Sequence, residues 1–452
     1  MDHAPHPYPV PNSLTPFWRT ELHELDSHRS TPELPRECDI AIIGAGYSGA
    51  AMAYHLLDEN PSPPSMVILE AREACSGATG RNGGHLKPDV YFQVPKYSKM
   101  FGKDAATEIA LFESSQVYAV KDLVEKEKID CEFTLTRAVD VCLDEEHAAK
   151  CKKEFDELVA RKAPSVRDVY YAQGKAAEIM SGVKGAKGAF SFTAGHIWPY
   201  KLVMHLLSMA LERGVNLQTH TPVTKVSDTQ DSEGRWTVRT PRGELKAKKV
   251  IFCTNGYTAG LAPQYKERII PVKGICSRIK VPEEKAVPHL PNTYSLRYGP
   301  GLYDYQITRN DGSIIIGGAK QHFVHDLKEW YDNTDDATLI EPAKGHFDGY
   351  MQRNFRGWED SGAVTDGIWT GVMGYTSDLR PHIGGVPGKA GQYVIAGFNG
   401  HGMPLICLSS KGLAKMIREG CPFSESGIPK LFQTSEARLA HGENAILGTA
   451  PQ

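Results

Sequence analysis

The stretch "DIAIIGAGYSGAAMAYHLL", residues 39–57, decides the fold expected for this chain. It begins with a short apolar run typical of a buried strand, continues through a Gly-x-Gly-x-x-Gly loop and ends in a segment with helical spacing. In such a loop Gly44 permits a tight turn, Gly46 lets the backbone approach a diphosphate, and Gly49 lets the helix pack on the strand. The free N–H groups of the helix and its dipole favour phosphate. The stretch therefore predicts a strand–loop–helix unit that binds a dinucleotide.

The next apolar strand ends at Glu70, 21 residues after Gly49. A carboxylate at this place can accept hydrogen bonds from both ribose hydroxyls of a dinucleotide. It would repel a 2′-phosphate, which argues against NADP and leaves NAD and FAD open. Besides the glycines, the residues expected to contact this half of the ligand are Tyr47, Ser48, Glu70, Ala71 and Arg72.

A second glycine-rich segment, "ACSGATGRNGGH" at residues 74–85, follows this strand directly. An NAD site needs no such segment, whereas the ribityl chain and isoalloxazine of FAD extend across the domain and need close backbone contact with polar donors. The segment therefore favours FAD, and an NAD-dependent dehydrogenase remains the alternative. The residues expected to line the ribityl–flavin half are Ser76, Thr79, Gly80, Arg81, Asn82, Gly83, Gly84 and His85.

A third loop, "GFNGHGMP" at residues 397–404, lies between an apolar strand and a segment with helical spacing. A helix N-terminus aimed at the N1–C2 edge of a flavin would stabilise the negative charge of its reduced form. Pro404 suits a first helical turn, and Asn399 or His401 could add a donor. The residues expected to contact the ring are Gly397, Asn399, Gly400, His401, Gly402 and Met403.

Together, these motifs resemble those of the D-amino-acid-oxidase-like family of FAD-dependent oxidoreductases, which includes glycine and sarcosine oxidases. "IWPYKLVMHLLSMALERGV", "TPVTKV", "KVIFCTNGYT" and "YQITRNDGSIIIGGAK" extend the resemblance over residues 37–420, in the order typical of the family. The glycine-rich segment is most similar to the γ-glutamylputrescine-oxidoreductase branch and its fungal relatives. The resemblance implies an α/β fold of two domains, a Rossmann-like FAD-binding domain interleaved with a β-sheet substrate domain.

The resemblance also implies roles for four further positions. Val223 would meet the adenine side of FAD through its backbone, although a plain buried strand valine is the alternative. His401 matches the active-site histidine in the Gly-His-Gly of sarcosine oxidases. Lys273 lies where a cation near flavin N5 would promote reaction with oxygen, although a surface lysine is the alternative. Arg309 resembles the arginine with which glycine oxidases hold the substrate carboxylate, although the following "NDG" is typical of a turn with a solvated arginine.

Two positions depart from the sarcosine-oxidase pattern. Pro404 stands where those enzymes carry a lysine for the substrate carboxylate, which favours an amine or a γ-glutamyl-type derivative over a simple α-amino acid. Gly371 stands where they carry the cysteine that binds flavin. We therefore expect non-covalent FAD, with a histidine such as His85 as the alternative point of attachment.

These observations predict FAD-dependent oxidation of a C–N bond in an amine or an N-substituted or γ-glutamyl amino compound to an imine. With O₂ as acceptor the second product is H₂O₂. The alternatives are a dehydrogenase of the same fold that uses another electron acceptor, and a non-catalytic FAD-binding redox subunit.

The remaining features limit the classes of protein to which the chain can belong. The net charge of −3 and the absence of basic tracts give no indication of a nucleic-acid partner, and no apolar run reaches the length of a membrane span. Nine cysteines without a Cys-x-x-Cys pair favour reduced thiols, a cytoplasmic location and no metal site. The pair Asp335–Asp336 is interpreted as solvated. The predicted divisions are an N-terminal arm (1–36), an FAD-binding domain (37–92, 188–262 and 358–425), a substrate domain (93–187 and 263–357) and a C-terminal surface tail (426–452).

Overall fold

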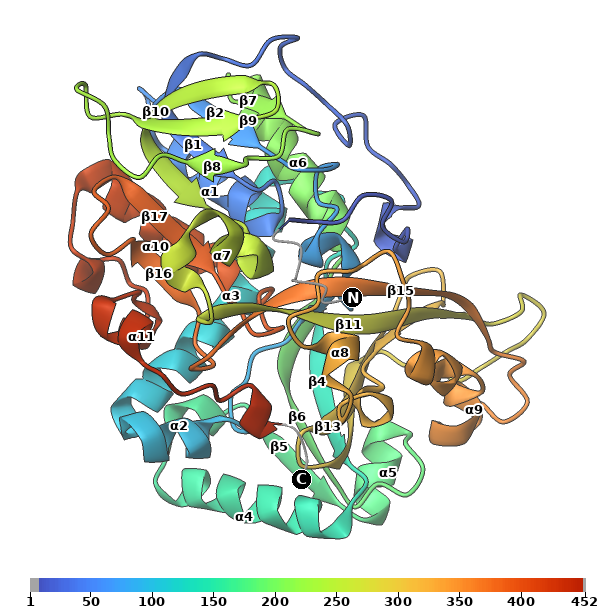
Figure 1. The fold of residues 1–452 in the computed structure, drawn as a ribbon. Coiled ribbons are helices and arrows are strands. Elements are labelled where there is room, and N and C mark those ends of the chain that lie inside the picture. Colours follow the sequence, from blue (N-terminus) through green and yellow to red (C-terminus); the bar gives the residue numbers. More distant parts are fainter. Residues whose placement is uncertain (1–7, 450–452) are drawn as a thin grey trace.

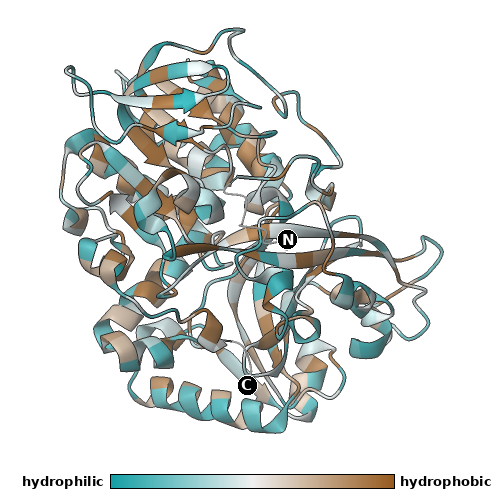
Figure 2. Cartoon of the chain, in the orientation of Figure 1, coloured by the Kyte–Doolittle hydropathy of each residue, from teal (hydrophilic) through white to brown (hydrophobic). Residues whose placement is uncertain are grey.

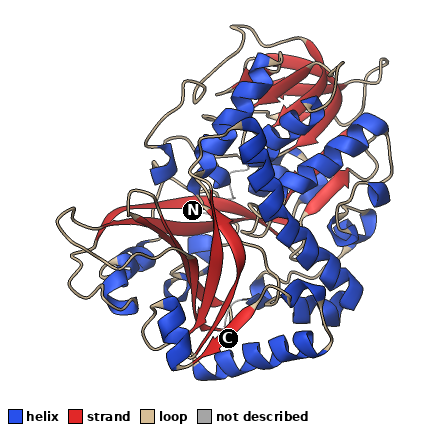
Figure 3. Cartoon of the chain, turned by 180° about the vertical axis from the view of Figure 1, so that it is seen from behind, coloured by secondary structure: helices blue, strands red, loops and turns tan. Residues whose placement is uncertain are grey.

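The computed structural model describes residues 8–449, so the first part of the predicted arm and the last three residues of the predicted tail lie outside the described residues. Two sheets organise the chain (Figures 1 and 3). The first lies in the upper part of Figure 1, and the second, with its long curved strands, lies in the lower part. Figure 2 shows apolar residues concentrated in the strands of both sheets.

The first sheet has the strand order β16-β17-β10-β1-β2-β7, with β8 and β9 added beside β10. Its centre is parallel, because β1 pairs in parallel with both β10 and β2. Ala41 and Ile42 in β1 are fully buried, as expected of a parallel strand covered on both faces. The strands are β1 (Glu37–Ile43), β2 (Met66–Leu69), β7 (Asn216–Gln218), β8 (Lys225–Val226), β9 (Trp236–Thr240), β10 (Gly243–Phe252), β16 (His382–Gly385) and β17 (Gln392–Ala396).

The second sheet is mixed and has the order β15-β11-β14-β13-β12-β4-β6-β3, with β5 paired to β6. Its longest strands, β11 and β15, pair in antiparallel fashion and cross the middle of the molecule (Figure 1). The strands are β3 (His85–Leu86), β4 (Thr134–Cys142), β5 (Tyr170–Gln173), β6 (Gly188–His196), β11 (Ile269–Lys280), β12 (Thr293–Gly299), β13 (Leu302–Thr308), β14 (Ile314–Gly317) and β15 (Val364–Thr376).

Helix α1 packs against α6 and α10 beside the first sheet, and α4 lies across the lower ends of β4 and β6 in the second (Figures 1 and 3). None of the helices within residues 8–449 is both long and apolar enough to cross a membrane. The α-helices are α1 (Tyr47–Leu57), α2 (Val94–Phe101), α3 (Lys103–Glu127), α4 (Glu145–Ala160), α5 (Lys175–Ser181), α6 (Pro199–Glu212), α7 (Thr258–Leu261), α8 (Leu327–Trp330), α9 (Tyr350–Asn354), α10 (Ile406–Glu419) and α11 (Glu436–Ala440). The 3₁₀ segments used below are η2 (Ala78–Arg81) and η4 (Asn255–Tyr257).

The strand pairing divides the chain differently from the predicted domains. Strands β3, β6 and β15 fall within the divisions assigned to the FAD-binding domain, but all three pair in the second sheet. The reason is that an apolar strand carries no local signal for its partner: β6 pairs along its whole length with β4, and β15 does so with β11.

The described part of the N-terminal arm packs onto the body, as predicted. Trp18 is almost fully buried, and its carbonyl accepts a hydrogen bond of 2.8 Å from Trp198 Nε1. Farther toward the N-terminus, the carbonyl of Val10 accepts a hydrogen bond of 2.9 Å from the Arg72 guanidinium. The arm thereby reaches the glycine-rich segment after β2.

The prediction of a surface tail after residue 425 is wrong for the described residues. Ile446 is fully buried in the core beneath the second sheet. Arg438 donates to Asp378 at 2.8 Å, and Thr434 Oγ1 lies 2.9 Å from Tyr265 Oη. The composition looked polar because single apolar anchors alternate with charged residues, of which Arg438 is paired with Asp378 of the body.

Candidate active site

One large cavity, of about 600 Å³, lies between the two sheets and is lined by all three glycine-containing loops. Most of the residues predicted from those loops line it. They are Gly44, Gly46, Tyr47, Ser48, Glu70, Ala71, Arg72, Ser76, Thr79, Arg81, Asn82, Gly83, His85, Asn399, Gly400, His401, Gly402 and Met403. Val223 and Lys273 line it as well.

The first loop is built by contacts that only glycine tolerates. Gly44 has φ +106°, and a Cβ there would lie 2.6 Å from the carbonyl oxygen of Cys253. A Cβ on Gly49 would lie 1.9 Å from the carbonyl oxygen of Gly44, so Gly49 serves the packing of α1 on β1 and does not line the cavity. The N-terminus of α1 therefore sits directly against the end of β1, with its backbone open to the cavity.

The carboxylate of Glu70 is held at the end of β2. Its Oε2 accepts a hydrogen bond of 2.8 Å from Ala45 N, and its Oε1 accepts one of 3.1 Å from Arg72 N. These two backbone donors fix the carboxylate at the cavity wall, where the ribose of a dinucleotide would need an acceptor.

Arg72 and Arg81 converge on one buried carboxylate, Asp336. Arg72 donates to both Asp336 oxygens at 2.9 Å, and Arg81 Nε lies 3.2 Å from Asp336 Oδ2. Asp336 is fully buried, so the interpretation of this residue as solvated is wrong. The sequence could not reveal this, because its partners lie more than 250 residues away along the chain. Two cations against one anion leave a net positive charge beside the cavity.

Gly80, Gly84 and Gly397 support the loops without lining the cavity. A Cβ on Gly80 would lie 2.0 Å from the carbonyl oxygen of Cys75, and one on Gly397 would lie 2.4 Å from Thr376 Cγ2. These glycines allow close packing, which the sequence could not distinguish from contact with a ligand.

Several buried polar atoms that border the cavity have no hydrogen-bond partner within residues 8–449. They include Ser76 Oγ, Tyr257 Oη and His85 Nε2. Burial of such groups without a partner is costly, so a polar ligand that fills the cavity would satisfy them. His85 Nδ1 lies 2.8 Å from Thr293 Oγ1, and burial together with the nearby Lys87 charge lowers the pKa of this imidazole well below its ordinary value.

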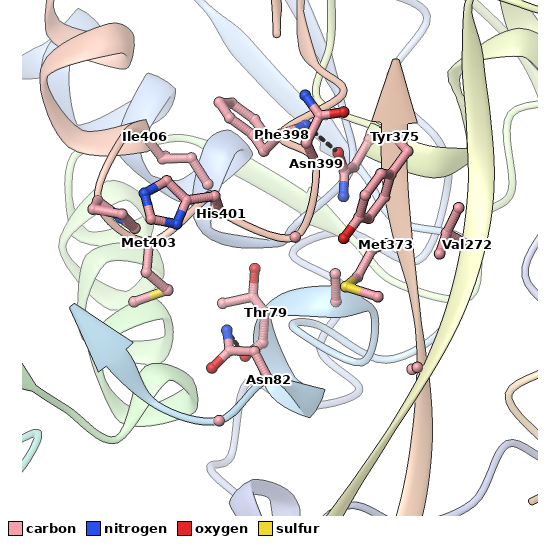
Figure 4. Close-up of a pocket in the computed structure, with 18 of the residues that line it drawn as sticks. Thr79, Asn82, Val272, Met373, Tyr375, Phe398, Asn399, His401, Met403 and Ile406 are labelled. Carbon is pink, nitrogen blue, oxygen red and sulfur yellow. Dashed lines mark hydrogen bonds between the residues drawn. The ribbon is translucent and has the colours of Figure 1, made fainter. Parts of the chain in front are cut away.

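The third loop is braced by side chains from its neighbours. Asn255 Oδ1, from η4 in the "TNGY" motif, accepts a hydrogen bond of 3.0 Å from Gly397 N. Asn399 Oδ1 accepts one of 2.8 Å from Thr376 N, so this amide holds the end of β15. Helix α10 begins at Ile406, which places Pro404 in the turn before the helix. Figure 4 shows Thr79 and Asn82 facing this loop across the cavity, with Met373 and Tyr375 beside it.

His401 forms an ion pair that the sequence did not predict. Its Nε2 lies 2.7 Å from Oε2 of Glu113, a buried residue of α3. Burial opposes protonation of the imidazole, but the charge of Glu113, its hydrogen bond and the nearby Asp89 outweigh burial and raise the pKa of His401. Burial and the Glu113 charge likewise raise the pKa of Asp89. Glu113 carried no sequence signal, because it lies in an amphipathic helix among other charged residues.

At the end of the cavity beyond β3, two cations share a second carboxylate. Asp140 in β4 is almost fully buried; it accepts hydrogen bonds from Lys87 Nζ and, at 2.9 Å, from Arg297. Burial opposes its ionisation, but the two cations keep the pKa of Asp140 below its ordinary range. Lys87 also donates to Ser295 Oγ at 2.7 Å. The one sequence signal for Asp140 is that it interrupts an apolar strand.

Lys273, in β11, lines the cavity and is nearly inaccessible to solvent. Its Nζ donates a hydrogen bond of 2.9 Å to Thr338 Oγ1. Burial lowers the pKa of this ammonium group. The alternative of a surface lysine is therefore wrong.

The structure does not bring Arg309 to the cavity. Its guanidinium pairs with Glu132 at 2.6 Å, and it stacks on the rings of Phe17 and Trp198. Although the backbone of residues 309–313 forms the predicted turn, the side chain is buried. It is thus neither a solvated arginine nor placed to hold a substrate carboxylate, because the aromatic rings of the arm and of Trp198 cover it.

Comparisons with known proteins agree with this site. The profile of a family described as FAD dependent oxidoreductase matches residues 39–416. The chain is 24% identical over 387 residues to gamma-glutamylputrescine oxidoreductase of Escherichia coli K12, with 84% of each protein covered.

Solved structures share the fold. Glycine oxidase from Geobacillus kaustophilus superposes with a TM-score of 0.70 at 19% identity, covering 89% of this chain and 99% of that one. L-proline dehydrogenase from P. horikoshii superposes with a TM-score of 0.68 at 18% identity, covering 88% and 98%. Because the family profile spans most of the sequence, the chain belongs to this family of FAD-dependent oxidoreductases.

Proposed function

We propose that this enzyme oxidises the C–N bond of an amine, or of an N-substituted or γ-glutamyl amino compound, to an imine, with O₂ as acceptor and H₂O₂ as second product. The observation that carries the proposal is the single cavity that joins the three glycine-containing loops to the Lys87–Asp140–Arg297 cluster. FAD would occupy the loops, and the cluster would meet the substrate.

The residues present fit non-covalently bound FAD. The N-terminus of α1 and the cationic Arg72–Asp336–Arg81 group suit a diphosphate, and Glu70 suits the ribose. Ser76 and Tyr257 offer buried hydroxyls without other partners within residues 8–449. When bound, FAD supplies the acceptor for the hydride equivalent removed from the substrate.

The substrate end of the cavity is bipolar. Lys87 and Arg297 exceed Asp140 by one positive charge, which suits an acidic group on the substrate. Asp89 and Glu113 stand with His401 on the side of the third loop, which suits an amine. A compound with an amino group at one end and a carboxylate at some distance from it matches this arrangement better than a free α-amino acid, whose two groups are adjacent.

Two further residues would act on charge near the reacting centre. His401 would hold a proton on its imidazole, stabilised by Glu113, and so oppose the negative charge that develops on reduction. Lys273 would place a buried ammonium group beside the cavity, where it would favour the reaction of the reduced enzyme with O₂.

Anaerobic bleaching of the flavin tests this proposal. The panel should contain an N-acylated diamine with a distal carboxylate, the same diamine without the acyl acid, and free glycine. We expect the acid-bearing amine to bleach the flavin fastest, and equimolar H₂O₂ to form in air.

Other outcomes would contradict specific parts of the proposal. Bleaching by free α-amino acids alone would overturn the substrate assignment. Bleaching without peroxide would indicate a dehydrogenase, and no bleaching by any compound would indicate a non-catalytic subunit. A spectrum without flavin bands would refute FAD binding.

A further inference from the structure

Three side chains with soft-metal donor atoms converge outside the cavity. Cys142 ends β4, and His147 and Cys151 lie on the first turns of α4. All three are buried, and their Sγ and ring-nitrogen donor atoms lie within 4.8 Å of one another. Cys151 Sγ lies 3.7 Å from His147 Nε2. Within residues 8–449 this is the one such group of three or more His, Cys, Asp or Glu side chains.

The sulfur–nitrogen separation in this group matches that of a tetrahedral metal centre. With Zn–S bonds of about 2.3 Å and Zn–N bonds of about 2.0 Å, two donors of a tetrahedron lie roughly 3.5 to 3.8 Å apart. The observed 3.7 Å between Cys151 Sγ and His147 Nε2 falls within this range. All three donor atoms lie within 4.8 Å of one another, so a shift of about 1 Å or less would bring Cys142 into the same range.

The backbone holds the three donors in place. Asp144 caps α4, and its carboxylate accepts a hydrogen bond of 2.7 Å from His147 N. His147 and Cys151 are four residues apart and so share one face of the helix. Cys142 is fixed by pairing of β4 with both β6 and β12. Rigid elements thus position every donor.

The charge balance also suits a divalent cation. Two thiolates and one neutral imidazole around Zn²⁺ give a neutral centre, which can be buried at low cost. Arg297 is the register partner of Cys142 on β12, so a further positive charge lies beside the two sulfur atoms.

We propose that Cys142, His147 and Cys151 bind one thiophilic d¹⁰ ion, Zn²⁺, with a water molecule as fourth ligand. Binding releases the thiol protons and changes no oxidation state. The ion would link α4 to the end of β4. Cys142, at that end of β4, is the register partner of Arg297 on β12. This site is separate from the FAD loops and does not depend on the proposed function.

Metal content of the purified flavoprotein tests the site. The protein is produced with added Zn²⁺, desalted and analysed by elemental mass spectrometry. We expect about one Zn²⁺ per chain in the wild type, and at least a tenfold loss in the variants Cys142→Ser and Cys151→Ser. Cys421→Ser is the matched control, because Cys421 lies outside the cluster, and it should keep its zinc. Substitution with Co²⁺ should give d–d absorption at longer wavelengths than the flavin bands.

A second measurement uses the wild type alone, in case the variants do not fold. Cys142 and Cys151 should resist alkylation in the zinc-loaded protein and react after a chelator removes the ion, as peptide mass spectrometry would show. Three results would overturn the proposal: a wild type that takes up neither Zn²⁺ nor Co²⁺, zinc retained in the double serine variant, or a native disulfide between Cys142 and Cys151.

Discussion

Replacing Glu113 by glutamine should lower the pKa of His401 and move the pH dependence of catalysis toward acid. Glutamine keeps the shape of the side chain and can still bond the imidazole, but it removes the charge that lies 2.7 Å from His401 Nε2. In the wild type that charge outweighs burial and raises the pKa of His401. Without it, burial favours the neutral ring.

The size of the shift follows from the geometry. An opposite charge within about 4–6 Å shifts a pKa by roughly 1–3 units. The His401 side chain is 38% accessible, and Asp89 remains nearby, so we expect the lower end, about one unit. One unit corresponds to about 1.4 kcal/mol and to roughly a tenfold change in the protonated fraction above the pKa. In the wild type, His401 keeps its proton to a pH above the ordinary histidine range. In Glu113→Gln, His401 would lose that proton at a lower pH.

The assay is the rate of anaerobic flavin reduction as a function of pH, together with the pH titration of the flavin absorbance. His401→Gln should abolish the transition, which assigns it to the ring. Glu125→Gln is the matched control, because Glu125 lies on the same helix but at the surface, paired with Lys121. An unchanged transition in Glu113→Gln, or one that moves toward alkali, would refute the reasoning.

Four further changes test other parts of the site. Gly44→Ala introduces a Cβ 2.6 Å from a carbonyl oxygen at φ +106°, and a strain of roughly 1–3 kcal/mol should weaken FAD binding about tenfold or more by fluorescence titration. Arg297→Met should raise KM for acid-bearing amines while that for neutral amines stays within twofold, and equal effects would remove Arg297 from substrate binding. Asp140→Asn leaves Lys87 and Arg297 without their carboxylate and should lower the free energy of unfolding by about 3–5 kcal/mol at neutral pH. Because the pKa of Asp140 is lowered in the folded protein, the difference between wild type and variant in calorimetry should shrink as pH falls below the ordinary carboxyl range. Lys273→Met should slow reoxidation by O₂ and leave anaerobic bleaching unchanged, whereas equal reoxidation rates would refute its role.

The parts of the site made by local backbone geometry could be predicted from the sequence. The glycine spacing of the first loop and the place of Glu70 at the end of the next strand belong to one motif of about 30 residues, so their spacing carries the information although Gly44 also packs against Cys253. Contacts between residues that are far apart in the chain leave no such signal in the sequence. In the sequence Asp336 resembles a solvated acid, but in the fold it pairs with Arg72. Arg309 lies in a recognisable turn, but its side chain stacks on an aromatic ring.

The substrate end shows the same limit more strongly. Lys87, Asp140 and Arg297 come from different strands or from residues just beyond them, and only the pairing of β4 with β12 brings two of them together. The order of strands in a mixed sheet cannot be derived from apolar runs, which explains why the predicted divisions separate β6 and β15 from the other strands of the sheet in which they pair. Glu113 adds a contribution from α3, because its carboxylate contacts His401 of the third loop.

At both ends of the cavity, one buried carboxylate is paired with two cations. Asp336 pairs with Arg72 and Arg81, and Asp140 pairs with Lys87 and Arg297, so in each group two cations share one buried carboxylate. An unpaired buried charge is expensive in the empty protein, and a ligand anion would remove that cost. At the first end the diphosphate of FAD is such an anion. The same logic at the second end points to a substrate that carries an acid, which is why the acid-bearing amine in the substrate panel discriminates best.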